Sequence, residues 1–232
     1  MKPLLIFNII QCLCVVLVFS QEITFHNQKF VAKNVTTSVV KLKGENVIKV
    51  ERDLGALPFD EIELESTVDE PTYVKLRDVD FKDGIIEVKM LSQIQDPSPF
   101  KNAQGFIGVA FRIDENDSAY ESIYLRPRVG RSDNQFARNR TVQYYAYPNF
   151  KFDRLRKEAP GTYETTAPVD LNEWITMRIE VTGEKAYMYI NDSKYSTFVV
   201  EKMKGETTHG SIGLWVDIGT VGYFKDLKIT KR

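Results

Sequence analysis

The chain has few of the residues that crosslink a protein or hold a transition metal. It contains two cysteines and two histidines in 232 residues, and both cysteines, Cys12 and Cys14, lie within the first 20 residues. Without that segment the chain has no cysteine, so it forms no disulfide and depends on an apolar core for its stability. The scarcity of cysteine and histidine also argues against a zinc site and against a Ser-His-Asp hydrolase.

Long apolar runs are missing as well, except at the N-terminus. Lys2 is followed by an apolar run at 3–19, broken only by Asn8 and Gln11, and then by Ser20. This order is typical of a secretory signal peptide, and the run is too short to be taken as a membrane span. We therefore expect a signal peptide at 1–20, cleavage near Ser20, and a secreted or periplasmic protein with a single domain at 21–232.

No charge of one sign dominates the chain. The net charge is −1, and it is near −2 once the segment that contains Lys2 is removed. A nearly neutral chain lacks the positive field with which proteins bind nucleic acids or anionic membranes nonspecifically. Neither partner is expected.

Helical spacing of apolar residues is not sustained anywhere, and strand-like alternation recurs instead, for example at 85–90 and 174–181. The predicted strands lie at 23–31, 46–51, 72–76, 84–91, 105–113, 120–126, 141–147, 174–181, 185–190, 197–200, 211–216 and 223–230. A dozen short strands predict an all-β fold in which two antiparallel sheets pack face to face, as in a jelly roll.

Arginine, in contrast, is concentrated in one window. Seven of the twelve arginines lie between Arg126 and Arg156, where the only lysine is Lys151. A guanidinium group binds carboxylate, sulfate or phosphate through two parallel hydrogen bonds, which an ammonium group does not, so the window suggests fixed recognition of an anion. The polar connection at 127–140 is long for a compact β domain, and such connections often carry function.

Two interpretations of this window stay open. In the first, four arginines bind an acidic sugar: Arg126, Arg128, Arg138 and Arg140. In the second, the arginines form an internal ion-pair network with the acidic residues Asp133, Asp153 and Glu158.

Aromatic residues near the arginines offer flat faces on which a pyranose ring packs. The candidate platforms are Tyr120, Tyr124, Tyr144 and Trp215.

Two acidic runs are further candidates. The run 114–117, with Asp114 and Asp117, is most simply a hairpin turn, with a calcium site as the alternative. The run 61–65 places three glutamates on one face of an expected edge strand.

Several stretches together resemble the concanavalin A-like, laminin-G-like jelly-roll domains. They include GFIGVAFR at 105–112, YLRP at 124–127, GSIGLW at 210–215 and YFKDLKI at 223–229. Within that group the chain resembles secreted bacterial domains near the 3-keto-disaccharide hydrolase family, over about 74–230. The resemblance implies a concanavalin A-like jelly-roll sandwich and a carbohydrate partner.

The resemblance leaves open whether the chain is an enzyme. The hydrolase-like relatives carry glutamine, histidine and glycine after the last GxIGL strand, where this chain has Trp215, Val216 and Asp217. We predict an exported, lectin-like domain that recognises carbohydrate, including acidic or modified glycans. One alternative is a glycoside hydrolase acting on (3-keto) glycosides, with Glu121 and Asp217 as the catalytic acids. Another is a structural or protein-interaction module without a sugar site. No cofactor is expected, apart from the calcium alternative.

Overall fold

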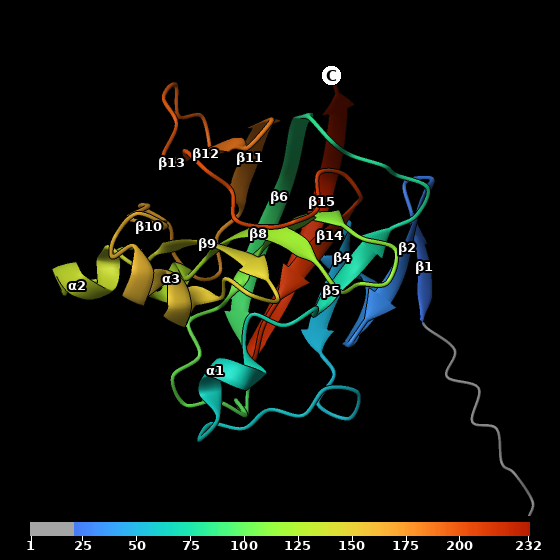
Figure 1. The fold of residues 1–232 in the computed structure, drawn as a ribbon. Helices are drawn as coiled ribbons and strands as arrows, with labels where there is room; N and C mark the ends of the chain where they lie inside the picture. Colours follow the sequence, from blue (N-terminus) through green and yellow to red (C-terminus); the bar gives the residue numbers. More distant parts are fainter. Residues whose placement is uncertain (1–20) are drawn as a thin grey trace, which may run out of the picture.

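The structure is a computed structural model that describes residues 21–232. The predicted signal peptide and its cleavage site lie outside the described residues. In the described part, two antiparallel sheets of eight and seven strands pack face to face (Figure 1). The predicted all-β fold, a concanavalin A-like jelly-roll sandwich of two antiparallel sheets, is confirmed. The described residues include no helix that is long and apolar enough to cross a bilayer.

The strand order of each sheet shows how distant parts of the chain are brought together. In spatial order, the eight-stranded sheet contains β1 (Glu22–Phe25), β2 (Gln28–Lys33), β5 (Tyr73–Leu76), β14 (Ser211–Val216), β7 (Ile107–Ile113), β8 (Tyr120–Leu125), β9 (Val142–Tyr147) and β10 (Glu164–Thr165). The seven-stranded sheet contains β13 (Phe198–Val200), β12 (Lys185–Ile190), β11 (Ile175–Thr182), β6 (Gly84–Ile94), β15 (Thr220–Lys231), β4 (Glu45–Arg52) and β3 (Val35–Leu42).

The structure departs from the predicted strands in four places, one of which is the short strand β10, which was not predicted. The single strand expected at 23–31 is the hairpin β1–β2, because His26 and Asn27 take positive φ and turn the chain. Strand β3, VTTSVVKL, was not predicted, since its apolar and polar residues do not alternate regularly. The run at 61–65 is not an edge strand. It leads into the short helix α1 (Leu64–Thr67).

Three more short helical segments were not predicted. They are η1 (Pro127–Val129), α2 (Gln135–Arg138) and α3 (Phe152–Glu158). The first two lie inside the connection 127–140, where Asn134 caps α2 by accepting a hydrogen bond from the Ala137 amide. In Figure 1, α2 and α3 lie beside β9 and β10, and α1 lies at the lower edge.

The register of the eight-stranded sheet gives it two chemically different faces. Ile107 and Val216 are paired, and their side chains lie against Gly222 of β15, so they mark the inner face that is turned toward the other sheet. This inner face continues in the buried aliphatic residues Val109, Ile123 and Leu214. The outer face instead carries an aromatic layer that comprises Tyr73, Tyr120, Tyr124, Tyr145, Tyr147 and Trp215.

A long excursion of the chain covers part of this aromatic layer. Residues 53–72, which we call the cover loop, connect β4 to β5 and contain α1. The backbone carbonyl of Glu70 accepts a hydrogen bond from Trp215 Nε1 at 2.9 Å, which places the loop over the outer face. Asn34 holds the two ends of the loop together. Its backbone carbonyl accepts from the Asp53 amide at 3.0 Å, and its Nδ2 donates to the Pro71 carbonyl at 3.0 Å.

Candidate functional site

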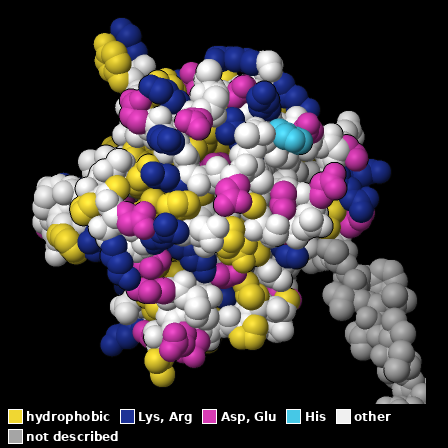
Figure 2. Space-filling model, viewed as in Figure 1, with side chains coloured by type: hydrophobic (Ala, Val, Ile, Leu, Met, Phe, Trp, Pro, Cys, Tyr) yellow, Lys and Arg dark blue, Asp and Glu magenta, His cyan; other side chains and the backbone are white. Residues whose placement is uncertain are grey.

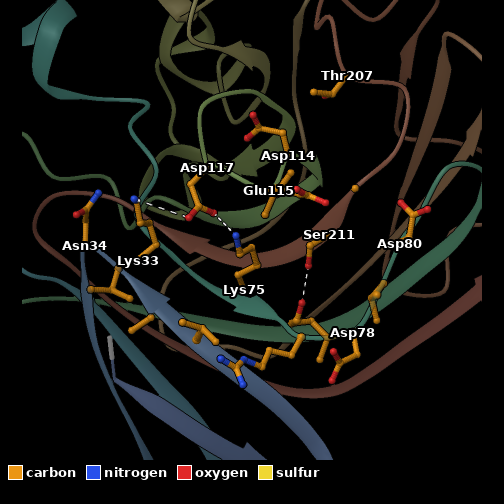
Figure 3. Close-up of a pocket in the computed structure, with 18 of the residues that line it drawn as sticks. Lys33, Asn34, Lys75, Asp78, Asp80, Asp114, Glu115, Asp117, Thr207 and Ser211 are labelled. Carbon is orange, nitrogen blue, oxygen red and sulfur yellow. Dashed lines mark hydrogen bonds and ion pairs between the residues drawn. The ribbon is translucent and has the colours of Figure 1, made fainter. Parts of the chain in front are cut away.

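The part of the outer face near β2 and β5 forms an open groove of about 1400 Å³ (Figure 3). Strands β2 and β5 contribute to its lining, together with the β7–β8 turn at 114–117 and the connection 206–210 that leads into β14. Residues from the start of the cover loop, Asp53 and Ala56, also line it. The described residues that line the groove include no Phe, Tyr or Trp. A ligand in the groove would therefore have no Phe, Tyr or Trp ring to stack on.

A triad of charged side chains lies in the groove. Asp117 accepts from Lys75 Nζ at 2.5 Å and pairs with Lys33 Nζ at 3.7 Å. The same carboxylate accepts a hydrogen bond from the Tyr73 hydroxyl at 3.0 Å. Lys33 and Lys75 come from neighbouring strands, and strand pairing places both side chains on the outer face. Sequence analysis missed this triad because its members are far apart in the chain, and only the sheet order β2–β5–β14–β7 brings Lys33, Lys75 and the β7–β8 turn close together.

The β7–β8 turn confirms the predicted hairpin. Asp114 accepts hydrogen bonds from the Ser118 amide and hydroxyl, both at 2.6 Å, and from the Ala119 amide at 3.1 Å. These bonds, against the effect of partial burial, hold the pKa of Asp114 below its usual value. No group of three or more His, Cys, Asp or Glu side chains that could hold a metal ion occurs within residues 21–232.

The other charged groups of the groove are mostly acidic. His209 Nδ1 and Asp80 Oδ1 are 2.7 Å apart. Asp78, Glu115 and Glu206 also line the groove, and within the described chain they have no ion-pair or hydrogen-bond partner through their side chains. Figure 2 shows that acidic and basic side chains are interspersed on this face of the molecule, with no patch of one sign.

Three of the four predicted platforms belong to the covered aromatic layer. Tyr120, Tyr124 and Trp215 are 0 to 2 % exposed. The Tyr124 and Trp215 rings are 4.9 Å apart between centroids, and Tyr120 stacks on Tyr147 at 5.1 Å. A Cβ at Gly108, which pairs with Trp215, would overlap the backbone of Tyr124, so the layer requires glycine there.

Two buried carboxylates lie beside this layer: Asp217 beneath the cover loop and Asp69 within the loop. Asp217 pairs with Arg52 Nη1 at 2.7 Å and accepts from the Asp69 amide at 3.0 Å. Burial raises the pKa of Asp217, although Arg52 opposes the shift. Burial also raises the pKa of Asp69 to about 6, and the nearby Asp217 charge adds to this effect.

The other predicted catalytic acid, Glu121, lies on the inner face of the sheet with the remaining platform, Tyr144. Glu121 Oε2 accepts from the Tyr144 hydroxyl at 2.5 Å, and Oε1 accepts from the Gly205 amide at 3.0 Å. Burial raises the pKa of Glu121 to about 7, while these two hydrogen bonds act in the opposite direction. Glu121 and Asp217 therefore lie on opposite faces of one sheet, and the structure does not bring them together as a pair of carboxylates.

The arginine window is organised around a residue that sequence analysis did not single out. Glu164 in β10 pairs with Arg156, and lies 3.9 Å from both Arg126 and Arg140. Arg126 is buried and also donates to the Arg140 carbonyl at 2.7 Å and to the Tyr124 hydroxyl at 2.5 Å.

The other predicted arginines also have partners within the chain. Arg128 Nη1 donates to the Ala103 carbonyl at 3.0 Å, and Arg138 Nη2 donates to Gln135 Oε1 at 3.1 Å. None of the four predicted arginines lines the groove. Among the acids predicted to hold the network, Glu158 pairs with Arg154 at 2.7 Å and Asp153 lies 3.9 Å from Lys157, whereas Asp133 forms no ion pair in the described chain.

The sequence of this chain matches the model of one protein family. The model of the 3-keto-alpha-glucoside-1,2-lyase-like domain matches residues 61–230. The chain belongs to this family. The matched residues of the 3-keto-alpha-glucoside-1,2-lyase-like domain include α1, the aromatic layer, the β7–β8 turn and Lys75, whereas Lys33 and Asn34 lie before the match. A comparison with curated proteins finds no match.

Several solved structures are similar to this 3-keto-alpha-glucoside-1,2-lyase-like domain. The carbohydrate-binding module CBM66 from Bacillus subtilis is 12% identical, with a TM-score of 0.50, over 84% of this chain and 94% of that one. A putative glycosyl hydrolase from Parabacteroides distasonis is 14% identical, with a TM-score of 0.44, over 69% and 76% of the two chains. The Bacillus licheniformis β-glucanase is 10% identical, with a TM-score of 0.41, over 89% and 79%.

Proposed function

We propose that this chain is an exported, lectin-like domain that binds carbohydrate in the outer-face groove. The Lys33–Asp117–Lys75 triad carries the proposal, because it places two ammonium donors around one carboxylate acceptor at an open surface. Sugar hydroxyls both donate and accept hydrogen bonds, so they suit such an arrangement. Membership in a family named after a keto-glucoside supports a sugar as the ligand.

The charges of the groove indicate which sugars fit. Its lining contains seven acidic side chains and four basic ones, besides His209. This excess of negative charge favours neutral or amine-bearing sugars over uronates and sulfated sugars in the groove. Acidic glycans therefore remain a prediction only for the separate arginine window.

Groove variants test the proposal. We expect Lys75→Ala and Asp117→Asn each to weaken binding at least tenfold, because each removes a charge-assisted partner of a sugar hydroxyl. A glycan array with neutral, amino, uronate and sulfated sugars would identify the ligand, and calorimetry would measure the loss. Lys89→Ala is the matched control, since Lys89 lies in β6 of the other sheet and pairs with Asp226. Wild-type affinity in both groove variants would rule out this site.

A second candidate function is an enzyme acting on (3-keto) glycosides, which the family membership favours. The His209–Asp80 pair in the groove offers a general base that is oriented by a carboxylate. The same protein preparations would be assayed for release of 4-nitrophenol from 4-nitrophenyl 3-keto-α-glucoside. Turnover that is lost in His209→Ala, but kept in the control His26→Ala, would support this function. Glu121→Gln and Asp217→Asn would test the acids predicted from the sequence.

A further inference from the structure

The cover loop contacts the aromatic layer through polar atoms that a sugar would also use. Trp215 Nε1 donates to the Glu70 carbonyl at 2.9 Å, and the Tyr147 hydroxyl donates to Glu70 Oε2 at 3.2 Å. The Tyr120 hydroxyl lies 3.5 Å from the Asp69 carbonyl. Flat rings whose polar edges need hydrogen-bond partners are a common way to hold a pyranose. Residues 69–70 thus take the place that sugar hydroxyls would take.

Few of the loop's apolar side chains enter the main core. Val68, Phe59 and Leu64 belong to a separate small cluster with Phe100 and Ile218. Ile62 is 90% exposed. A segment with few contacts to the main core opens at a smaller free-energy cost than a core strand does.

Polar contacts instead hold the loop closed. Arg52, at the end of β4, donates to the backbone carbonyls of Leu57, Pro58 and Thr67 and to Asp217. Lys151 pairs with Glu70 from the other side of the loop. The loop is about 20 residues long, and compact loops of this length with adjoining ends are often functional.

The covered layer is continuous with the groove. Tyr73, whose hydroxyl reaches Asp117 of the groove triad, packs edge to face on Tyr120 of the layer at 5.5 Å. Asn34, which joins the two ends of the cover loop, lines the groove itself (Figure 3). A chain of sugar units that leaves the groove along the sheet would therefore meet the aromatic layer next.

We propose that the aromatic layer is a second carbohydrate subsite, a stacking platform for a pyranose ring, and that residues 69–70 of the cover loop occupy it until a longer glycan displaces them. The inference rests on the proposed function of the groove. A single sugar unit binds the groove alone, whereas an oligosaccharide binds both subsites and opens the loop.

The pH affects closure of the cover loop through the carboxyl group of Asp69. Its Oδ2 accepts from the Phe152 amide at 2.9 Å, and the charged groups acting on it are Asp217, Arg126 and Lys151. Because the pKa of Asp69 is about 6 under the closed loop and near 3.8 in water, the closed form is favoured at low pH and loses this advantage as the pH rises through 6. Two pKa units correspond to a roughly hundredfold change in the opening equilibrium.

Glu70→Ala is the test variant, because it removes the Tyr147 and Lys151 contacts of the loop and leaves the groove triad intact. Glu65→Ala is the matched control in the same loop, since the Glu65 side chain is exposed and lies 3.8 Å from the exposed Lys157. Hydrogen exchange would report opening of residues 53–72. Calorimetry at pH 7 would measure binding of two probes, methyl α-glucoside and maltotetraose, or a monosaccharide and a tetrasaccharide of the array-positive sugar.

We expect Glu70→Ala to speed exchange in the cover loop and to tighten oligosaccharide binding about tenfold, with monosaccharide binding unchanged. Maltotetraose should also speed exchange in the wild-type loop, and Glu65→Ala should behave as wild type. Faster exchange in Glu70→Ala without tighter oligosaccharide binding would overturn the second subsite while leaving groove binding intact. If neither the monosaccharide nor the oligosaccharide of any array sugar binds, the proposed function fails first, and the subsite fails with it.

Discussion

At the scale of single residues, burial determines what the predicted catalytic acids do. Glu121 was predicted as a catalytic acid of the glycoside hydrolase alternative, yet the residue is 1 % exposed and both of its carboxylate oxygens accept hydrogen bonds from the chain. A Cβ at Gly205 would overlap Glu121 Oε1, so the connection that leads to the groove wall packs directly on this carboxylate. The geometry makes Glu121 an anchor for residues 204–205.

This environment predicts how stability depends on pH. The pKa of Glu121 is about 7 in the folded chain and 4.5 in the unfolded chain, so the folded form binds the proton more tightly. The contribution of this group to stability is therefore greatest below pH 4.5 and falls as the pH rises, to about 3 kcal/mol less at pH 7. Urea unfolding from pH 4 to 8 would show a smaller fall in Glu121→Gln than in the control Glu115→Gln, whose side chain lies in the groove wall. Equal falls in both variants would assign the pH dependence to other groups.

At the scale of secondary-structure elements, the short strand β10 decides how the arginine-rich connection is held. Glu164 in β10 is nearly buried and lies within 4 Å of Arg126, Arg140 and Arg156, which come from three separate parts of the window. The sequence offered Asp133, Asp153 and Glu158 as partners because they are close along the chain. Glu164 reaches the arginines through its pairing with Gln143 of β9.

We therefore expect Glu164→Gln to destabilise the chain by about 2 to 3 kcal/mol, because it leaves the buried Arg126 and its neighbours without a negative partner. Asp133→Asn should change the free energy of unfolding by less than about 0.5 kcal/mol, since Asp133 is exposed and has no ion-pair partner in the described chain. Chemical denaturation of both variants measures the difference. A larger loss in Asp133→Asn would contradict the central place of Glu164.

At the scale of the whole molecule, the outer face divides into an open polar half and a covered aromatic half. The open half contains charged residues from β2, β5 and the β7–β8 turn. The covered half contains the rings of β8, β9 and β14 beneath residues 53–72. A carbohydrate that is held first by polar contacts and then by ring stacking would use both halves in turn.

Export is also a property of the whole chain. We expect a mature protein that begins at Gln21, because the basic, apolar and small-residue order of residues 1–20 is that of a cleaved secretory segment. Intact mass measurement of the protein recovered outside the cytoplasm, after expression of the full chain in a bacterial host, would check this. A recovered chain that keeps residues 1–20 would contradict cleavage.

The sequence by itself determined the sandwich, because the alternation of strand residues with a period of two and the residues typical of turns are both local signals. It also pointed to Tyr120, Tyr124 and Trp215 as candidate aromatic platforms, and the register places all three on the outer face of one sheet. Only the tertiary structure decided which residues are open to solvent. The sheet order β2–β5–β14–β7 brought Lys33 and Lys75 to Asp117, and the cover loop enclosed the rings. Local sequence signals do not predict either arrangement, because both depend on contacts between residues 40 to more than 140 positions apart.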